Sequence, residues 1–322
     1  MDAGVFGVDL FFTLSSFLIT RLLLAEQAAG QISVRNFYIR RALRIWPLYF
    51  TFLAASLALA HFAHIRDIGW AYWLTFFTFT GNWACAFWGY PSSYIFPLWS
   101  VGVEEQFYLA WPLCIKFLGR RTFVGMCAAI FTMSMAVKAG LALSGAVHPA
   151  AWCNTFGRLE PIALGALLAC HKSETLPASE PVLWLRLLLA LVIVVIANVF
   201  FPWNHVTLGS GLITYPLVAL ASAVFIGTAM HSSSLRRVLS IRPLVYLGRI
   251  SYGLYVFHIG SLYLSDAMFS HMVRNWGGAT LLRPAIAFTI TILFAVISYE
   301  LMEKYFLRLK LRFTRIESRP GG

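Results

Sequence analysis

The sequence is poor in charge. Only 12% of its 322 residues are Asp, Glu, Lys or Arg, and 59% are hydrophobic, whereas soluble domains carry about 25% charged residues. No hydrophilic stretch is long enough to form a separate soluble domain. Because this depletion runs along the whole chain, it excludes an ordinary soluble enzyme and indicates that lipid is the solvent.

Acidic residues are fewer than basic residues: the chain has 13 Asp and Glu against 25 Lys and Arg, so its net charge is +12. Such an excess of positive charge could indicate a protein that binds nucleic acid. The basic residues, however, lie in short clusters between apolar runs, which is the pattern of the positive-inside rule. We therefore expect the lipid bilayer, and no nucleic acid, as a partner.

Several chemical signatures are also missing. The five cysteines lie in or beside apolar segments without a C-x-x-C pair, so we expect buried thiols and neither a disulfide framework nor a metal site. A Walker loop, an H-E-x-x-H motif and a serine nucleophile elbow are absent from the sequence. No bound cofactor is expected.

Long apolar runs are what the chain has instead. A membrane-spanning helix needs about 20 apolar residues, and only helices or closed barrels satisfy their backbone groups in lipid. The predicted fold is an all-α, polytopic transmembrane helix bundle, one domain over residues 1–322 with a basic cytoplasmic tail at 304–322. The nine predicted spans are 5–24, 46–65, 98–119, 122–144, 155–171, 183–201, 209–230, 244–267 and 283–303.

The stretch 71–88 is ambiguous because it contains Gly81 and Asn82. If it is re-entrant or interfacial, 18 basic residues fall on one side of the membrane, and three, Arg66, Arg274 and Arg283, fall on the other. The positive-inside rule then predicts a multi-pass protein of the bacterial inner membrane with a cytoplasmic C-terminus.

Polar residues inside the spans are candidates for function, because they are costly in lipid. Asp9, Thr13, Ser16 and Thr20 follow helical spacing and share one face. This face suits a lined cavity headed by a carboxylate. An acidic residue placed at a helix N-terminus explains Asp9 equally well.

Arg41 and Arg44 are one turn apart and follow Arg40. Their guanidinium groups could bind phosphate oxygens together, or they could simply anchor the helix at the cytoplasmic face. Glu104 shares a helical face with Ser100 and Tyr108, which favours an interior, functional carboxylate.

His258 is the histidine well inside a long predicted span, where it is either a base or a satisfied core residue. Arg158 with Glu160, and Glu303 further on, are expected to form structural ion pairs between helices.

Five motifs in order resemble those of the family-3 membrane acyltransferases, which include O-antigen and nodulation-factor O-acetylases. They are Gly7-Val8-Asp9-Leu10-Phe11-Phe12-x-Leu14-Ser15, Arg40-Arg41-x-x-Arg44-Ile45-x-Pro47, Trp99-Ser100-x-x-x-Glu104-Glu105-Gln106-Phe107-Tyr108, Gly248-Arg249-Ile250-Ser251-Tyr252-x-Leu254-Tyr255-x-x-His258 and Ser298-Tyr299-x-x-x-Glu303.

The resemblance implies a bundle of about ten helices that transfers an acyl group, usually acetyl, from cytoplasmic acyl-CoA to a carbohydrate hydroxyl. It assigns the donor to the Arg-x-x-Arg motif, here Arg41 and Arg44, with Arg40 beside them. Asp9 and Glu104 would then orient or support the catalytic base. Tyr252, in the fourth motif, is given a structural role.

One departure affects the catalytic base. The family's first helix carries an Arg and a His regarded as catalytic, and this chain begins at the motif that follows that helix. We therefore expect an incomplete, inactive form whose Asp9–Thr13–Ser16 face is exposed to lipid, with His258 as the substitute base if it is active. The alternatives are a transporter or exporter of a modified glycan, and a truncated inactive acyltransferase.

Overall fold

The computed structural model describes residues 6–30, 32–63, 68–171, 179–272 and 279–314. Within these ranges the chain forms helices and turns without a strand, so the all-α prediction is confirmed. The long helices are α1 (Phe6–Ala28), α2 (Val34–Ala63), α5 (Trp99–Phe117), α6 (Arg120–Leu143), α9 (Glu180–Phe200), α10 (Tyr215–His231), α13 (Ser251–Met272) and α14 (Ala279–Ser298). The shorter helices are α3 (Trp70–Phe77), α4 (Gly81–Trp88), α7 (Ala150–Cys153), α8 (Glu160–Cys170), α11 (Ser233–Leu239), α12 (Arg242–Arg249) and α15 (Lys304–Leu311).

Six of the described helical segments are long and apolar enough to cross a membrane, so the predicted count of nine is not confirmed. The three predicted spans outside this set correspond to α5, α8 and α13. Helix α8 has 11 residues, about 16 Å of helix, which is well short of the ~30 Å hydrocarbon core. Residues 71–88 form the eight-residue helices α3 and α4, in agreement with the prediction that this stretch does not span.

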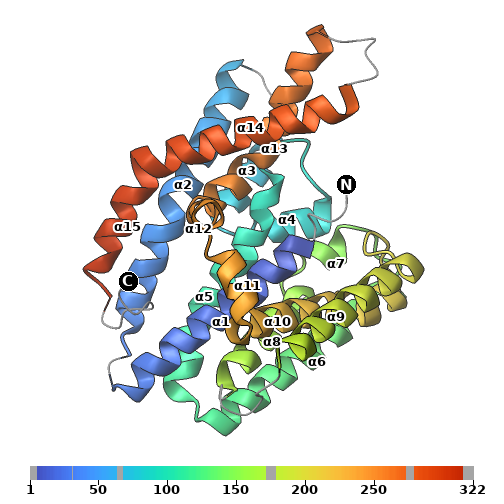
Figure 1. Cartoon of the computed structure of the whole chain (residues 1–322). Coiled ribbons are helices and arrows are strands. Elements are labelled where there is room, and N and C mark those ends of the chain that lie inside the picture. The colour runs from blue at the N-terminus through green and yellow to red at the C-terminus, as the bar shows by residue number, and fades with distance from the viewer. Residues whose placement is uncertain (1–5, 31, 64–67, 172–178, 273–278, 315–322) are drawn as a thin grey trace.

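The helices form two packed groups with α5 between them (Figure 1). In the first group α1 lies along α8, and α6, α9 and α10 pack beside them. In the second group α13 packs on α14, and α15 lies against α2. Helix α5 contacts both α1 and α2. Side chains from both groups therefore meet along α5.

The contact between α1 and α8 depends on a glycine. A Cβ at Gly165 would lie 2.2 Å from the Thr13 carbonyl oxygen, so a larger residue would push the helices apart. The Ser16 hydroxyl donates to the Ile162 carbonyl at 2.6 Å across this contact. The polar face of Asp9, Thr13 and Ser16 is fully buried. The prediction that this face is exposed to lipid is therefore wrong, because α8 covers it.

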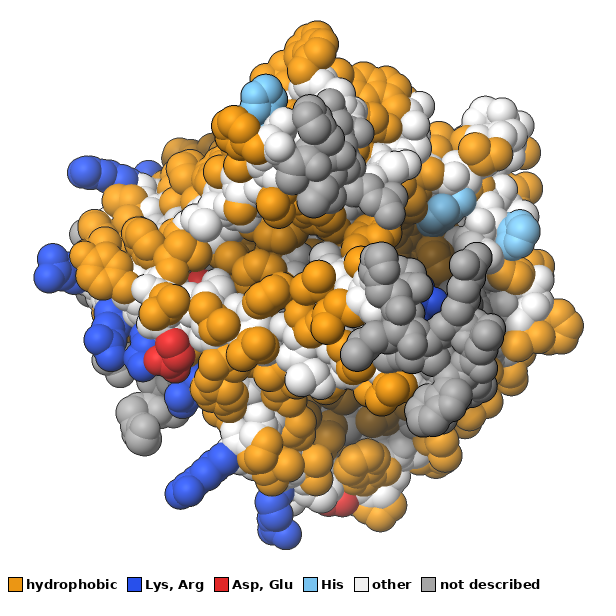
Figure 2. All heavy atoms as spheres, turned by 90° about the horizontal axis from the view of Figure 1, so that it is seen from above, with side chains coloured by type: hydrophobic (Ala, Val, Ile, Leu, Met, Phe, Trp, Pro, Cys, Tyr) orange, Lys and Arg blue, Asp and Glu red, His pale blue; other side chains and the backbone are white. Residues whose placement is uncertain are grey.

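The lipid-facing surface is clearest on α9. Leu185, Leu188, Ile193, Val195 and Val199 are all exposed on this helix. Exposed apolar side chains cover much of the surface in Figure 2. A surface of this kind is stable in a bilayer and would aggregate in water.

Charge separates the two ends of the bundle. Lys116, Arg120, Arg121, Arg236 and Arg237 lie at the end where α5 and α10 finish and α6 begins. The opposite end carries the loops 89–95, 144–149 and 201–209. In Figure 2 the lysine and arginine side chains lie mainly at the left and lower edges of the view, and the histidine side chains lie at its top and right.

The predicted tail at 304–322 is partly helical. After α14 the chain makes a π-helical turn, Tyr299–Glu303, and continues as α15. The Arg40 guanidinium donates to the Phe313 carbonyl at 3.0 Å. Residues 304–314 are thus packed on α2, and residues 315–322 lie outside the described part of the chain.

Candidate functional site

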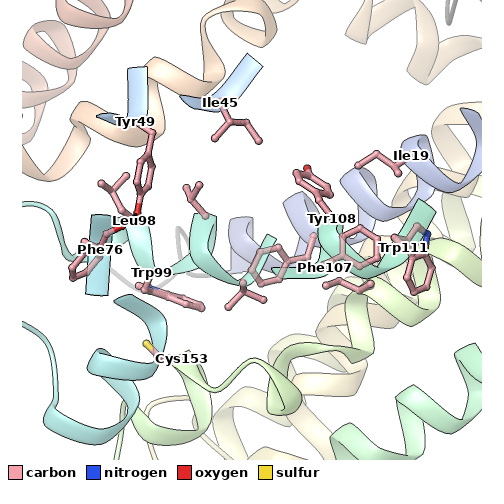
Figure 3. Packing of buried hydrophobic residues seen from close by; sticks show 14 of the residues in the cluster. Ile19, Ile45, Tyr49, Phe76, Leu98, Trp99, Phe107, Tyr108, Trp111 and Cys153 are labelled. Atoms are coloured by element: carbon pink, nitrogen blue, oxygen red, sulfur yellow. Dashed lines mark hydrogen bonds between the residues drawn. The ribbon is translucent and has the colours of Figure 1, made fainter. Parts of the chain in front are cut away.

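Helix α5 places a carboxylate at the junction of the two groups. Glu104 is 3% exposed, and its Oε1 accepts hydrogen bonds from the hydroxyl of Ser15 on α1 at 2.5 Å and from the hydroxyl of Tyr108, one turn along α5. Tyr108 lies on the side of α5 that faces Ile19 and Ile45 (Figure 3). The predicted face of Ser100, Glu104 and Tyr108 is buried as a whole.

Two arginines of α2 approach this carboxylate. The Arg41 guanidinium lies 5.4 Å from the centroid of the Tyr108 ring, in cation–π contact. Arg44 interacts electrostatically with both Glu104 and Glu303, although its own side chain is exposed. We call Arg41, Arg44, Glu104 and Glu303 the open cluster, because an arginine connects its buried carboxylates to the surface.

Glu303 belongs to the π-helical turn between α14 and α15. Its Oε1 accepts a hydrogen bond from the Ser298 hydroxyl at 2.9 Å. The hydroxyl of Tyr252 on α13 donates to the Ile45 carbonyl at 3.1 Å, which ties α13 to α2. Single π-helical turns are frequent at functional sites, and this turn directs Glu303 into the bundle.

Tyr255 joins α13 to α5. Its hydroxyl lies 2.6 Å from that of Ser100 and donates to the Pro97 carbonyl at 2.5 Å. His258 follows one turn later, with Nδ1 2.5 Å from the Tyr255 carbonyl oxygen. The candidate base His258 is therefore held by its own helix, one turn beyond the contact with Ser100.

The open cluster and the neighbouring Glu105 contain polar atoms that no described residue satisfies. Arg41 Nε and Glu105 Oε1 are enclosed and lack a hydrogen-bond partner. Glu105 Oε2 accepts from Trp46 Nε1 at 3.1 Å, and the Trp46 side chain is 44% exposed. Because buried polar groups are normally paired, these atoms suit a polar ligand or water.

A second set of charges lies within the first helix group. Arg158 contacts Asp9 at 2.8 Å and Glu160 at 3.7 Å, and Lys138 contacts Glu160 at 2.5 Å. All four side chains are at most 1% exposed. The Ser134 hydroxyl also donates to Glu160 at 2.8 Å. We call Asp9, Lys138, Arg158 and Glu160 the sealed cluster.

The sealed cluster changes the interpretation of Asp9. Asp9 was predicted to serve catalysis, but its carboxylate is paired and enclosed, which favours a structural role. Arg158 and Glu160 are in contact as expected, although each has a closer partner. Lys138 was missed. The sequence did contain a clue, because Lys138 is the charged residue in the middle of the apolar run 122–144.

Arg40 also differs from its motif neighbours. Its side chain is 5% exposed and forms an ion pair with the buried Glu26 at 2.7 Å. Together with the bond to Phe313, this pair occupies the guanidinium. The placement favours a structural role for Arg40, which was predicted to bind acyl-CoA, and leaves Arg41 and Arg44 facing Tyr108 and the two carboxylates.

Residues from all five motifs meet at one membrane site, and Ser15 of the first motif brings in α1. A buried carboxylate, flanking hydroxyls and adjacent arginines provide a proton acceptor beside groups that bind anions. The profile of the type-3 acyltransferase family, described as an acyltransferase domain, matches residues 2–300. The chain belongs to this family, which confirms the predicted class.

Curated relatives agree with this class. The chain is 27% identical over 279 residues to the peptidoglycan O-acetyltransferase OatA of Listeria monocytogenes, covering 79% of the chain and 44% of OatA. It is 26% identical over 327 residues to YrhL of Bacillus subtilis, named as a candidate peptidoglycan O-acetyltransferase, covering 94% and 50%. It is 27% identical over 337 residues to a candidate O-acetyltransferase of Staphylococcus aureus, SACOL0978, covering 95% and 53%.

The chain spans about half the length of these relatives. Two of the three are named for peptidoglycan, whereas the motif resemblance included acetylases of lipopolysaccharide O-antigen. No solved structure is significantly similar to the protein.

Proposed function

We propose that the protein is an integral membrane O-acetyltransferase that moves an acetyl group from acetyl-CoA to a hydroxyl of a cell-wall glycan. The observation that carries this proposal is the open cluster, where Glu104, Ser15 and Tyr108 meet two arginines from α2. The names of the peptidoglycan relatives support the acceptor class.

Arg41 and Arg44 bind the donor. Coenzyme A carries several phosphate charges, and arginine guanidinium groups pair with phosphate oxygens through two parallel hydrogen bonds. Arg44 is exposed, and Arg41 has an unsatisfied Nε. Both side chains therefore have bonding capacity left for an anionic ligand.

Glu104 is the proposed general base. The acceptor hydroxyl gives its proton to the Glu104 carboxylate, directly or through the Ser15 hydroxyl, while its oxygen attacks the thioester carbonyl carbon. A C–O ester bond forms, the C–S bond breaks, and the CoA thiolate takes up the proton. The hydrogen bonds from Ser15 and Tyr108 hold the carboxylate in place. His258 is the alternative base.

The donor side is the cytoplasmic side in this proposal. The basic end of the bundle, with Lys116, Arg120 and Arg236, faces the cytoplasm under the positive-inside rule. Arg41 and Arg44 are the eighth and eleventh of the 30 residues of α2. Tyr38, near the start of α2, donates to the Leu109 carbonyl in the half of α5 that leads to Lys116. The protein is then placed in the bacterial inner membrane with its C-terminus inside.

Sealed proteoliposomes separate this function from export of an already modified glycan. Labelled acetyl-CoA is supplied outside vesicles loaded with a peptidoglycan tetrasaccharide. An acetyltransferase with this sidedness produces labelled, O-acetylated saccharide in the lumen when the basic end faces outward. Movement of the saccharide without label would instead support the transporter.

A further inference from the structure

Aromatic rings from three separate loops meet at the end of the bundle opposite the basic residues. The His148 ring lies 5.7 Å from the Tyr90 ring and 5.2 Å from the Trp203 ring. Trp203 lies 5.2 Å from the buried Trp152, and Tyr90 lies 4.9 Å from Phe96. We call Tyr90, His148 and Trp203 the aromatic platform. All three side chains are partly exposed.

The platform is held rigidly by the elements beneath it. The Tyr215 hydroxyl of α10 donates to the Trp203 carbonyl at 2.9 Å, and the Trp203 amide donates to Asn198 Oδ1 at 3.2 Å. Trp152 packs against Trp99 at the start of α5. Trp99 is five residues from Glu104, about 7.5 Å along the helix axis. Two ring contacts, Trp203 to Trp152 and Trp152 to Trp99, therefore link the platform to the helix that carries Glu104, on the non-basic side of that helix.

One polar atom of the platform is unsatisfied. His148 Nδ1 is enclosed and has no hydrogen-bond partner among the described residues. Burial lowers the pKa of His148 below its ordinary value, so the ring is neutral near pH 7 and can exchange a hydrogen bond with a hydroxyl. A binding site that combines flat apolar rings with a few polar atoms is the usual form of a small-ligand site.

We propose that the aromatic platform binds the acceptor glycan, with pyranose rings stacked on Trp203 and Tyr90 and a sugar hydroxyl or amide bonded to His148. The proposal rests on the proposed acetyltransferase function, since it supplies the acceptor for Glu104. Sugar rings present apolar C–H faces together with hydroxyl edges. The platform offers the matching surfaces, aromatic faces for the first and the partly exposed His148 ring for the second.

An interfacial aromatic belt is the competing explanation, because Trp and Tyr gather at membrane surfaces. Trp70 is a belt residue of this kind, 77% exposed at the start of α3. The platform differs because its rings pack on one another and come from loops between helices rather than from one lipid-facing helix. Trp70 therefore provides a matched control.

The test measures binding by isothermal titration to the full chain in nanodiscs. The probes are a peptidoglycan tetrasaccharide of alternating N-acetylglucosamine and N-acetylmuramic acid, maltotetraose and acetyl-CoA. Trp203→Ala and His148→Gln should each weaken tetrasaccharide binding by about tenfold, while Trp70→Ala leaves it unchanged. Acetyl-CoA affinity should be the same in all variants, which also shows that they are folded. Trp203→Phe should retain most of the binding.

The outcomes separate the two proposals. Failure of the wild type to bind the tetrasaccharide, equal binding of maltotetraose, or an equal loss in Trp70→Ala would overturn the platform as a glycan site. If saccharide binding behaves as expected but no acetyl group is transferred, the acetyltransferase proposal fails instead. Normal transfer with an unchanged saccharide KM in Trp203→Ala would overturn only the platform.

Discussion

The sealed cluster and the open cluster both place charges inside a helix bundle, but they differ in pairing and access. In the sealed cluster two acids and two bases balance, and every side chain is at most 1% exposed. In the open cluster the two carboxylates are buried, Arg44 reaches the surface, and none of the four side chains forms an ion pair within 4 Å with another described residue. An intramembrane charge alone does not identify a site. Incomplete pairing together with access to a ligand does.

Removing one partner from the sealed cluster should have the largest effect on folding. Arg158→Met leaves Asp9 buried without its cation, which costs about 3–5 kcal/mol. Thermal unfolding in nanodiscs should show a large loss of stability. The double variant Asp9→Asn, Arg158→Met should recover part of it. If Arg158→Met melts like the wild type but cannot transfer acetyl, the sealed cluster is catalytic and the comparison is broken.

Arg40→Met tests whether Arg40 stabilises the fold while its motif neighbours Arg41 and Arg44 bind the donor. Because Glu26 would lose its buried partner, we expect a loss of stability of about 3 kcal/mol, and unchanged acetyl-CoA affinity in the fraction that remains folded. Unfolding and donor titration are measured on the same preparation. Weakened donor binding at normal stability would place Arg40 in the donor site.

Arg41→Ala and Arg44→Ala should show the opposite behaviour. Each removes a charge-assisted contact with the donor, about 1.5–3 kcal/mol of binding energy, so the Kd for acetyl-CoA should rise roughly 10- to 150-fold. The melting temperature should stay close to that of the wild type. Arg35→Ala, an exposed arginine of the same helix, is the control. Equal behaviour of all three would reduce these arginines to membrane anchors.

The smallest effect is expected at an exposed pair. Lys304 contacts Glu300 at 2.6 Å one turn away, and both side chains are about two-fifths exposed. Lys304→Ala should change stability by less than about 0.5 kcal/mol and leave donor affinity unaltered. A loss comparable to that of Arg158→Met would show that exposure does not separate the two kinds of charge in this protein.

The local part of the site could be predicted from sequence. Helical spacing is sufficient to place Glu104 and Tyr108 on one face, and Arg41 and Arg44 on neighbouring turns. The motif resemblance also brought these helices together with α13 and the Glu303 turn. These predictions depend on local periodicity and on recurring motifs, both of which the chain displays directly.

The partners of buried charges could not be predicted in the same way. Asp9 and Arg158 are 149 residues apart, and no periodicity connects them. Hydropathy also missed the irregular stretch before Glu160, which shortens α8 to 11 residues. Because α8 is short and Gly165 brings it close to α1, the polar face of α1 is covered. That packing depends on contacts between residues distant in sequence, which the hydropathy of the sequence does not predict.

Acetyl transfer by Glu104→Gln is the most direct test of the open cluster as the reactive site. The variant keeps the size of the side chain and can still hydrogen-bond Ser15 and Tyr108, but it cannot accept a proton. We expect the rate of labelled acetyl transfer from acetyl-CoA to a peptidoglycan tetrasaccharide to fall about 10²- to 10⁴-fold, with donor affinity and melting temperature unchanged. A wild-type rate in Glu104→Gln would contradict the account.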